Sequence, residues 1–443
     1  MNKKVAPLSD QTRNTDEPLT GMIRYLWSIS RSICGPGLRE SIEYFTSIHD
    51  ELKIKEIKTG TDLGGGWTVP DEWALHSSFI RVEDGSIYAK SEESNLHVVG
   101  FSDSFEGEIS WEELKSHLYT IPEMPTAIPY ITSYYRRSWG ICISYRDFER
   151  LSKAKKFYVS IRTRRTSGSM TLADCRLGGI STREIMFTSY LCHPSMANNE
   201  LSGPIVLSEI IRRVKSISAR RYSYRFLLGP ETLGAIAYMN LFGDELKTTV
   251  AAGFVLSCVG DENGFSHIQT PDGNTLADRL LKAALVGKDN AKTYDYQARG
   301  SDERHFASAG LELPFAGFCR SKYGTYSEYH TSLDNLDLVT EKGLTDSVET
   351  IFNIIDALEM GAVPRKTCLG EPFLAKYNLY NTEGHQGALQ KDVAFRLDLL
   401  SFSNGRRSIF DICIRCQIPL KWAIEECISL QGLGLLELDE MPI

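Results

Sequence analysis

The sequence predicts an α/β protein: a mostly parallel mixed sheet with helices on both faces, a small mostly-β inserted module and a C-terminal winged-helix-like module. Three observations lead to this prediction. Apolar, β-rich segments alternate with amphipathic helical patterns in residues 139–363, as in parallel sheets that are covered on both sides. Residues 56–138 contain short β-like segments separated by Gly, Asp, Asn and Pro, which is typical of a small β module. Residues 364–443 change to short helical patterns followed by a β-like tail, which suggests a winged helix.

Length and composition limit the classes of protein to consider. A chain of 443 residues is too long for one ordinary hydrophobic core, so two or three domains are expected. Hydrophobic residues make up 42% and charged residues 24% of the chain, which is typical of a soluble globular protein. The net charge of -8 gives no general attraction for nucleic acid or an anionic membrane. We found no signal-peptide pattern and no spanning segment, and the ten cysteines are scattered, so we expect a cytoplasmic protein.

The α/β domain is predicted to be interrupted by an insertion. Residues 18–55 are assigned to the same domain as residues 139–363, because the β-like texture begins only after them. The Cys-Gly-Pro-Gly sequence at residues 34–37 should divide their helical pattern into two helices. Residues 56–138 therefore form the inserted module. Within it, Ser-Trp-Glu-Glu at residues 110–113 has the spacing of a helix capping box.

Strand and helix patterns then follow one another along the α/β domain. The first two strands, at residues 155–165 and 169–179, are interpreted as an antiparallel pair. The later alternation is that of a parallel sheet. Its strands are expected at residues 185–191, 222–228, 250–259, 293–297 and 313–318. Its helices are expected at residues 205–214, 233–242, 274–286, 302–309 and 341–360.

The C-terminal module does not have the charge of a DNA-binding domain. From Lys391 onward it contains six Lys or Arg residues against eight Asp or Glu residues, whereas a DNA-binding wing is expected to be basic. We interpret residues 364–443 as a linker followed by a structural or interaction module. A nucleic acid contact through this module is the less favoured alternative.

Polar residues follow the predicted strand at residues 185–191. His193, Asn199 and Glu200 come directly after this strand and before the next helix. In open α/β sheets, ligands bind outside the carboxyl ends of the strands. These side chains are therefore candidates for a functional site, although His193 and Glu200 alone could equally cap the loop.

Three further stretches place polar residues at strand ends. Glu231 follows the second predicted strand of the parallel series, Asp302 lies in a Gly-Ser-Asp-Glu-Arg sequence, and His330 precedes Thr331 in the loop before the last helix. Each has a structural alternative: Glu231 and Asp302 could complement a helix dipole or cap a helix, and His330 could be an ordinary loop residue. Together, two imidazoles and several carboxylates are the groups that a zinc hydrolase uses to hold the ion and to activate water.

The order of these turns resembles that of the zinc aminopeptidases of the co-catalytic di-zinc exopeptidase class. The matching pieces are His193, Ala197–Gly203 (ANNELSG), Glu231–Gly234 (ETLG), Ser301–Glu303 (SDE) and His330-Thr331. The three-part layout also resembles a family that combines an aminopeptidase-like domain, an inserted module of unknown function and a C-terminal winged helix. The sequences WTVP, CHPSMANNELSGP, GPETLGAIAY and EYHTSLDNLD are similar to that family.

The resemblance implies ligand positions that this chain has partly changed. The bridging Asp of the di-zinc class falls on Asn199, the second Glu of its Glu-Glu pair falls on Thr232, and its later Asp falls near Cys258. The first Glu, the general base of that class, falls on Glu231 and is kept. Both histidines are also kept.

We therefore hypothesise a reduced site with one zinc ion in preference to two. The resemblance implies His193 and His330 as ligands and Glu231 as the base that activates a metal-bound water. Our hypothesis adds Glu200 as the carboxylate ligand. Asp302 is the alternative carboxylate, or a partner that orients a ligand histidine. Asn199, Arg304 and Tyr323 are the candidate substrate-binding residues; Arg304 and Tyr323 could equally be surface residues.

The leading prediction is an aminopeptidase-like, zinc-dependent hydrolase of amide or peptide bonds. Its expected substrate is a small peptide or an N-acylated small molecule. The alternative is a catalytically altered hydrolase scaffold that binds a ligand or acts as a regulator through its winged-helix-like module. We expect no membrane partner, and a homo-oligomer is left open.

Overall fold

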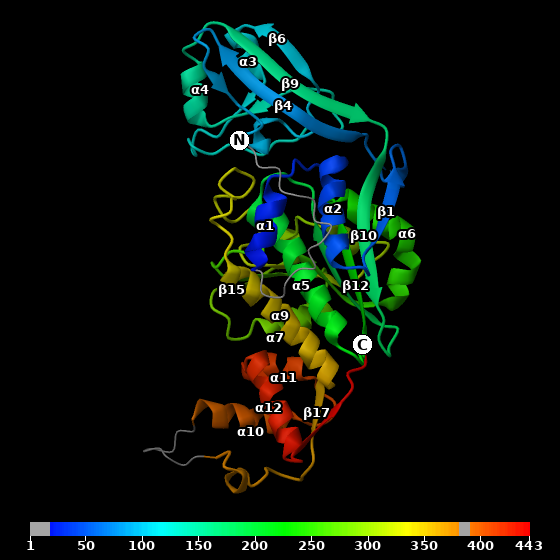
Figure 1. The fold of residues 1–443 in the computed structure, drawn as a ribbon. Coiled ribbons are helices and arrows are strands. Elements are labelled where there is room, and N and C mark those ends of the chain that lie inside the picture. Colours follow the sequence, from blue (N-terminus) through cyan, green and yellow to red (C-terminus); the bar gives the residue numbers. More distant parts are fainter. Residues whose placement is uncertain (1–17, 381–389) are drawn as a thin grey trace.

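The computed structural model describes residues 18–380 and 390–443, which form an elongated molecule with three parts (Figure 1). The α/β domain lies in the middle, a β-rich module lies at one end, and the C-terminal helical module lies at the other end. The predicted fold class is confirmed.

The main sheet of the described residues has eight strands in the order β1-β10-β12-β11-β13-β16-β14-β15. Its four central strands, β12, β11, β13 and β16, run parallel to one another, whereas β10 and β14 pair with their central neighbours in the antiparallel sense. The strands are β1 (Lys53–Lys58), β10 (Ser169–Leu177), β11 (Glu184–Tyr190), β12 (Ser223–Gly229), β13 (Val250–Leu256), β14 (Phe265–Ile268), β15 (Ala291–Tyr294) and β16 (Phe315–Cys319).

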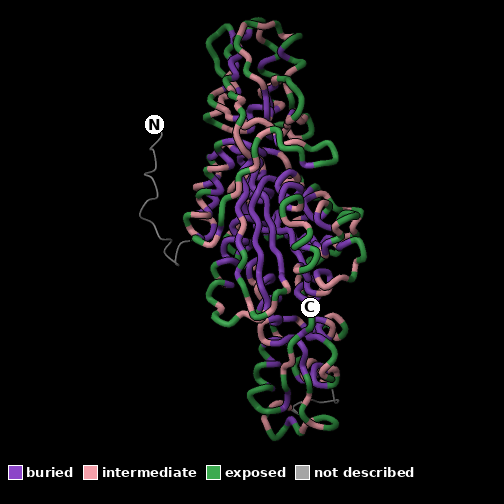
Figure 2. The backbone as a smooth tube through the Cα atoms, turned by 90° about the vertical axis from the view of Figure 1, so that its right-hand side faces the viewer, coloured by how far each residue is buried: buried purple, intermediate pink, exposed green. Residues whose placement is uncertain are grey.

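Helices cover both faces of this sheet because the central strands are apolar on both sides. Phe187, Phe226 and Phe254 stack on one another on one face, whereas Met186 and Val255 belong to the core of the other face. The first face is covered by α1 (Leu19–Trp27), α2 (Pro36–Ile48), α5 (Ser202–Ser216), α7 (Leu276–Ala284) and α9 (Glu341–Met360). The second face is covered by α6 (Leu233–Thr249) and α8 (Glu303–Phe306). Figure 2 shows the resulting buried sheet inside an exposed outer layer.

The strand order opens a crevice at one edge of the sheet. From β11 the chain passes through α5 to β12 on one side, and from β12 it passes through α6 to β13 on the other side of β11. Ligands of open α/β proteins bind where the connections change direction in this way. The carboxyl ends of β11 and β13 are therefore the expected location of a site.

The β-rich module is built around a four-stranded sheet of order β5-β4-β9-β6. One of its strands, β9 (Phe157–Thr166), lies beyond the predicted insertion of residues 56–138, and β9 does not pair with β10 as we predicted. Phe157, Val159 and Ile161 instead join the core of the module, and the chain then crosses to the main sheet. The helix start predicted at Ser110 is confirmed: α3 (Trp111–Ser116) follows it, and the Ser110 side chain accepts a hydrogen bond from the Glu113 backbone N–H.

The other elements of this part of the chain are short. They are β2 (Asp62–Gly64), β3 (Trp67–Thr68), β4 (Glu72–Val82), β5 (Ile87–Tyr88), η1 (Asn95–His97), β6 (Phe105–Ile109), α3 (Trp111–Ser116), β7 (Leu118–Tyr119), β8 (Ile141–Cys142) and α4 (Tyr145–Leu151).

The C-terminal module packs against the end of the α/β domain. Its strands β17 and β18 pair antiparallel, and Arg279 of α7 forms an ion pair with Asp411 of α11, with 2.7 Å between Nη2 and Oδ2. The elements are β17 (Val363–Lys366), η4 (Leu374–Tyr377), α10 (Lys391–Phe402), α11 (Ile409–Cys416), α12 (Leu420–Gly432) and β18 (Leu436–Asp439). Among the described residues, no helix combines the length and the apolar character needed to cross a membrane.

Candidate active site

Four strand ends bring the candidate residues to one edge of the sheet. His193 follows β11, Glu231 follows β12, Cys258 follows β13, and the loop that contains His330 follows β16. Because these strands are parallel neighbours, residues that are far apart in the sequence converge at their carboxyl ends.

A buried aspartate holds two of these loops together. The turn after His193 is a π-helical turn, η2 (Ala197–Leu201). The backbone N–H groups of Asn198 and Asn199 donate to the two carboxylate oxygens of Asp334, at 2.6 and 3.0 Å. Asp334 comes four residues after His330, so these bonds fix the two histidine loops relative to each other.

The two histidines lie side by side beneath a tyrosine of the inserted module. The ring centroids of His193 and His330 are 5.2 Å apart, and the ring of Tyr130 lies 4.6 Å from His193 and 5.2 Å from His330. The Tyr130 backbone N–H also donates to the His330 carbonyl at 2.9 Å. Burial lowers the pKa of His330 to about 3, and nearby His193 adds to this shift. His330 is therefore neutral near pH 7 and can bind a metal ion through nitrogen.

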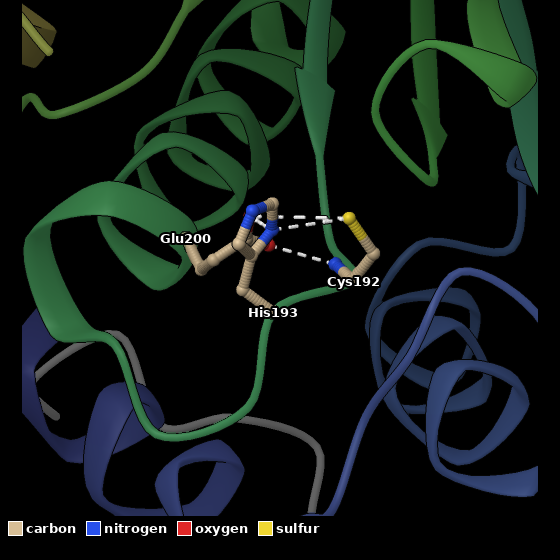
Figure 3. Close-up of side chains that lie close together, drawn as sticks. All are labelled: Cys192, His193 and Glu200. Carbon is tan, nitrogen blue, oxygen red and sulfur yellow. Dashed lines mark hydrogen bonds and ion pairs between the residues drawn. The ribbon is translucent and has the colours of Figure 1, made fainter. Parts of the chain in front are cut away.

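Glu200 contacts the ring of His193 directly (Figure 3). One carboxylate oxygen, Oε1, meets Nδ1 of His193, and the other, Oε2, accepts the backbone N–H of Cys192 at 2.7 Å. Burial alone would lower the pKa of His193, but the Glu200 carboxylate raises it overall. With Nδ1 engaged, Nε2 is the nitrogen of His193 that is available to a ligand.

The site also contains the half-buried Glu231 and the buried Asp302. Burial raises the pKa of Glu231 to about 7, where the Glu200 carboxylate adds to the effect and His193 opposes it. Burial and the nearby Glu231 carboxylate also raise the pKa of Asp302 well above its usual range. Asp302 accepts the Thr232 backbone N–H at 2.7 Å and does not line the cavity described next, so its position favours a supporting role over metal ligation.

A cavity of about 330 Å³ is lined by His193, Glu231 and His330. Tyr130 and Tyr134 of the inserted module are also part of its lining. The two phenol oxygens are 3.2 Å apart. One hydroxyl donates to the other in this pair, so the second keeps its proton for a ligand in the cavity.

The three predicted substrate-binding residues have different surroundings. Arg304 lines the cavity and donates to the Thr232 hydroxyl at 2.9 Å. Tyr323 is buried and donates to the Glu303 carboxylate, and it is not part of the cavity lining. Asn199 is buried and does not line the cavity.

Two of the three positions that depart from the di-zinc class, Asn199 and Cys258, lie close to each other. The Asn199 amide donates to the Tyr190 hydroxyl at 3.1 Å and lies 3.9 Å from the Cys258 sulfur. Burial raises the pKa of the Cys258 thiol well above its usual range. Thr232 offers only a hydroxyl, so these three positions supply no anionic ligand for a second ion near pH 7.

Several residues of the site have a strained backbone. Ser195, Thr232, Cys258 and His330 have φ values of 49°, 67°, 51° and 57°, in the left-handed region that non-glycine residues rarely adopt. Such strain persists where the surrounding structure enforces it, and it concentrates at functional sites.

Some residues of the site were missed in the sequence. Cys192 neighbours His193, and its sulfur lies 3.2 Å from Nδ1; its adjacency to a candidate ligand was an available signal. Tyr130 and Tyr134 belong to an aromatic cluster in the inserted module, which the prediction did not connect to the site. Buried Arg31 donates from Nε to the His193 carbonyl at 3.2 Å, and no motif marks it.

The donor atoms at this edge of the sheet are of the kinds that bind zinc. The cavity presents two imidazoles and the Glu231 carboxylate, and nitrogen, oxygen and sulfur are the ligands that zinc prefers. In addition, Cys192 Sγ, His193 Nδ1 and a Glu200 carboxylate oxygen lie within 4.8 Å of one another. Donors therefore lie on both sides of the His193 ring: Cys192 and Glu200 on one side, and the cavity that His330 and Glu231 line on the other.

This fold and strand-end cavity define an aminopeptidase-like α/β protein with a winged-helix module. The chain belongs to the family described as a domain of unknown function, DUF4910, whose model matches residues 20–361. A second model, described as a winged helix-turn-helix, matches residues 362–438. The combination that the sequence resembles is thereby confirmed.

Relatives and solved structures agree with this assignment. A Clostridium acetobutylicum protein, provisionally named a polysaccharide biosynthesis protein with aminopeptidase-like domain, is 34% identical over 431 residues, covering 96% of this chain and 97% of the relative. A crystal structure of a provisionally named peptidase from the same organism has a TM-score of 0.83 at 32% identity, and covers 95% of this chain and 96% of its own. A zinc aminopeptidase from Bacillus subtilis has a TM-score of 0.51 at 14% identity over 86% of this chain and 100% of its own, which shows a shared fold.

Proposed function

We propose that this protein is a zinc-dependent hydrolase that cleaves an amide bond of a small N-acylated substrate. The observation that carries the proposal is that His193, His330 and Glu231, from three separate strand ends, line one cavity. The aminopeptidase-like scaffold supports it as well. The position of the cavity at the carboxyl edge of the sheet is where such folds bind their ligands.

His193 and His330 would hold the zinc ion, and Glu231 would lie near it in the same cavity. A bound zinc ion would polarise the scissile carbonyl and make the attacking water more acidic. Glu231 takes the proton from that water and delivers it to the amine nitrogen as the C–N bond breaks, so one amide and one water give an acid and an amine. The spare phenol proton of the Tyr130 and Tyr134 pair is placed to donate to the developing oxyanion.

The substrate class follows from the cavity and from the relative. A cavity of about 330 Å³ suits one end of a small molecule or peptide. The name of the Clostridium relative refers to polysaccharide biosynthesis, which supports an N-acylated sugar over a peptide. The charge count of the C-terminal module gives a nucleic acid little attraction, so our proposed partner is the small-molecule substrate.

The purified full chain is expected to bind about one zinc ion and to release amine from N-acylated substrates. Zinc content is measured by atomic absorption, and amine release is measured on a panel of N-acyl sugars and short peptides. Chelation should abolish turnover, and added zinc should restore it. Turnover that persists without metal would contradict the proposal.

Glu200→Gln is expected to weaken zinc binding about 10–100-fold, the cost of losing a group that orients a metal-binding histidine. The carboxylate contacts His193 Nδ1 and the Cys192 backbone N–H, and the amide keeps the size but loses the charge. Competition with a chelator measures the affinity. Asp302→Asn is the comparison: if it weakens binding more than Glu200→Gln does, then Asp302 is the carboxylate that matters.

A second candidate is a binding protein built on a hydrolase scaffold. It is favoured by Asn199, Thr232 and Cys258, because these uncharged residues occupy three positions at which the di-zinc class has metal ligands. This candidate would be supported over the hydrolase if the chain binds zinc and binds an N-acyl sugar tightly but turns over no amide.

A further inference from the structure

A tryptophan of the inserted module lines the candidate active-site cavity and has no partner of its own. Trp67 shares this cavity with His193 and Glu231, and it is 38% exposed. With the described residues its ring forms no aromatic contact, and its indole N–H donates no hydrogen bond. Its ring is therefore free to contact a ligand. Three other tryptophans of this part of the chain pack on aromatic rings instead: Trp73, Trp111 and Trp139.

A glycine-rich hairpin positions Trp67. The strands β2 and β3 pair antiparallel, and residues 64–66, all glycine, have φ values of 80°, 60° and 88°, which glycine adopts without strain. These glycines have no side chains that would cover the indole. Leu63 is buried in the core of the module, and its carbonyl accepts a hydrogen bond from the Asn240 side chain of α6 at 3.0 Å. Because α6 begins just after Glu231, the hairpin is held in place relative to the proposed base.

The same cavity offers an accessible hydrogen-bond donor. Arg304 lines it and is exposed. Its Nη2 donates to the Thr232 hydroxyl at 2.9 Å, and its Nε donates to His305 Nε2 at 3.1 Å. These two bonds hold the guanidinium group, whereas Nη1 has no partner among the described residues. A ligand of this cavity therefore meets both a free aromatic ring and a free N–H group.

We propose that Trp67 stacks on the sugar ring of an N-acylated substrate and thereby selects the sugar over a peptide. This inference rests on the proposed function, because it places the amide beside His193 and Glu231 in the same cavity. The C–H face of a pyranose packs on the indole, and a ring hydroxyl accepts a hydrogen bond from Arg304. Because Trp67 is partly exposed, its ligand stays partly in water. A sugar keeps its hydroxyls hydrated there, whereas an apolar side chain gains less because part of its surface stays wet.

Methyl N-acetyl-β-glucosaminide is the probe, and its Kd for the zinc-loaded full chain carrying Glu231→Gln, which suppresses turnover, is measured by calorimetry. Adding Trp67→Ala is expected to raise Kd about tenfold, as for loss of an aromatic stack and the area that it buries. Trp67→Phe keeps a ring, so its Kd should stay within about threefold of the Glu231→Gln chain. Phe373→Ala is the control, since Phe373 is an exposed aromatic residue that does not line the cavity; its Kd should not change.

Tryptophan fluorescence tests the contact itself. Stacking removes water from the exposed indole, so the probe should move the emission of the Glu231→Gln chain to shorter wavelength. With Trp67→Phe added, the probe should still bind, but the emission should not move. A merely structural role for Trp67 would not produce this difference, and an emission change that persists in Trp67→Phe would contradict the stacking.

The outcomes separate the role of Trp67 from the hydrolase. If the Glu231→Gln chain does not bind the probe, or if Trp67→Ala leaves the Kd unchanged, the stacking role is wrong, whatever the chain hydrolyses. If N-acetylleucine amide binds more tightly than the probe and Trp67→Ala weakens it, Trp67 selects apolar side chains and the sugar is the wrong ligand. If the probe binds through Trp67 while the parent cleaves no amide, the stacking role stands and the hydrolase proposal fails.

Discussion

Glu231→Gln is expected to lower kcat for amide hydrolysis about 10²–10⁴-fold, the usual contribution of a general acid–base group, and to leave zinc bound. Glutamine has the same shape as glutamate but cannot accept the proton of the attacking water. Because Glu231 lines the cavity together with both histidines, the loss should appear in kcat more than in KM. Steady-state kinetics on the best substrate of the panel, with zinc content measured in parallel, checks this prediction.

The pH dependence gives an independent test of the same residue. Burial raises the pKa of Glu231 to about 7 in the metal-free chain, and a nearby cation favours the ionised carboxylate and so lowers it. A general base works only when deprotonated, so kcat/KM should fall as the pH drops through a value at or below 7. The residual activity of Glu231→Gln should not show this fall at low pH.

Glu262 offers a matched control. It follows β13 at the same edge of the sheet, but it is exposed, and its carboxylate accepts a hydrogen bond from the Thr340 hydroxyl. Glu262→Gln should keep the parent kcat and pH profile. If Glu231→Gln keeps them as well, Glu231 is not the base, and Asp302 becomes the next residue to replace.

The sequence was sufficient to predict the convergence of the site. Strand periodicity identified β11 and β12 and the positions of His193 and Glu231 directly after them, and parallel strands necessarily bring such positions to one edge. The positions of β11 and α9 in the structure agree closely with the predicted ranges. These features depend on local patterns, which a single sequence contains.

The partners of each side chain depend on tertiary structure and could not be predicted. Glu200 was predicted as a ligand from its place in the loop, but the contacts of its two oxygens with His193 Nδ1 and the Cys192 backbone N–H could not be read from the sequence. Tyr130 lies more than sixty residues before His193, and only the fold of the inserted module brings it over the histidines. The strand β9 was assigned to the wrong sheet because its apolar alternation fits either core.

His193→Ala and His330→Ala are each expected to weaken zinc binding on the order of 100-fold or more, because loss of a direct ligand should exceed the 10–100-fold cost of losing an orienting group. The ring centroids are 5.2 Å apart, and both rings line the cavity, so one ion can contact both. Zinc affinity is measured by chelator competition on the full chain, and circular dichroism checks that the variants fold. His76→Ala is the control, since His76 is exposed on β4.

The double variant distinguishes one shared ion from two separate sites. Residues that act as a unit are not additive: once either ligand is lost, removal of the other costs little more. If His193 and His330 hold the same ion, the double variant should bind zinc hardly more weakly than the weaker single variant. Additive losses would mean that each histidine acts on its own, and parent-like affinity in both single variants would show that the ion, if any, lies elsewhere. The loss of zinc affinity should therefore be largest for the two histidine variants, smaller for Glu200→Gln and absent for His76→Ala. A merely structural role for the two rings would not produce this order.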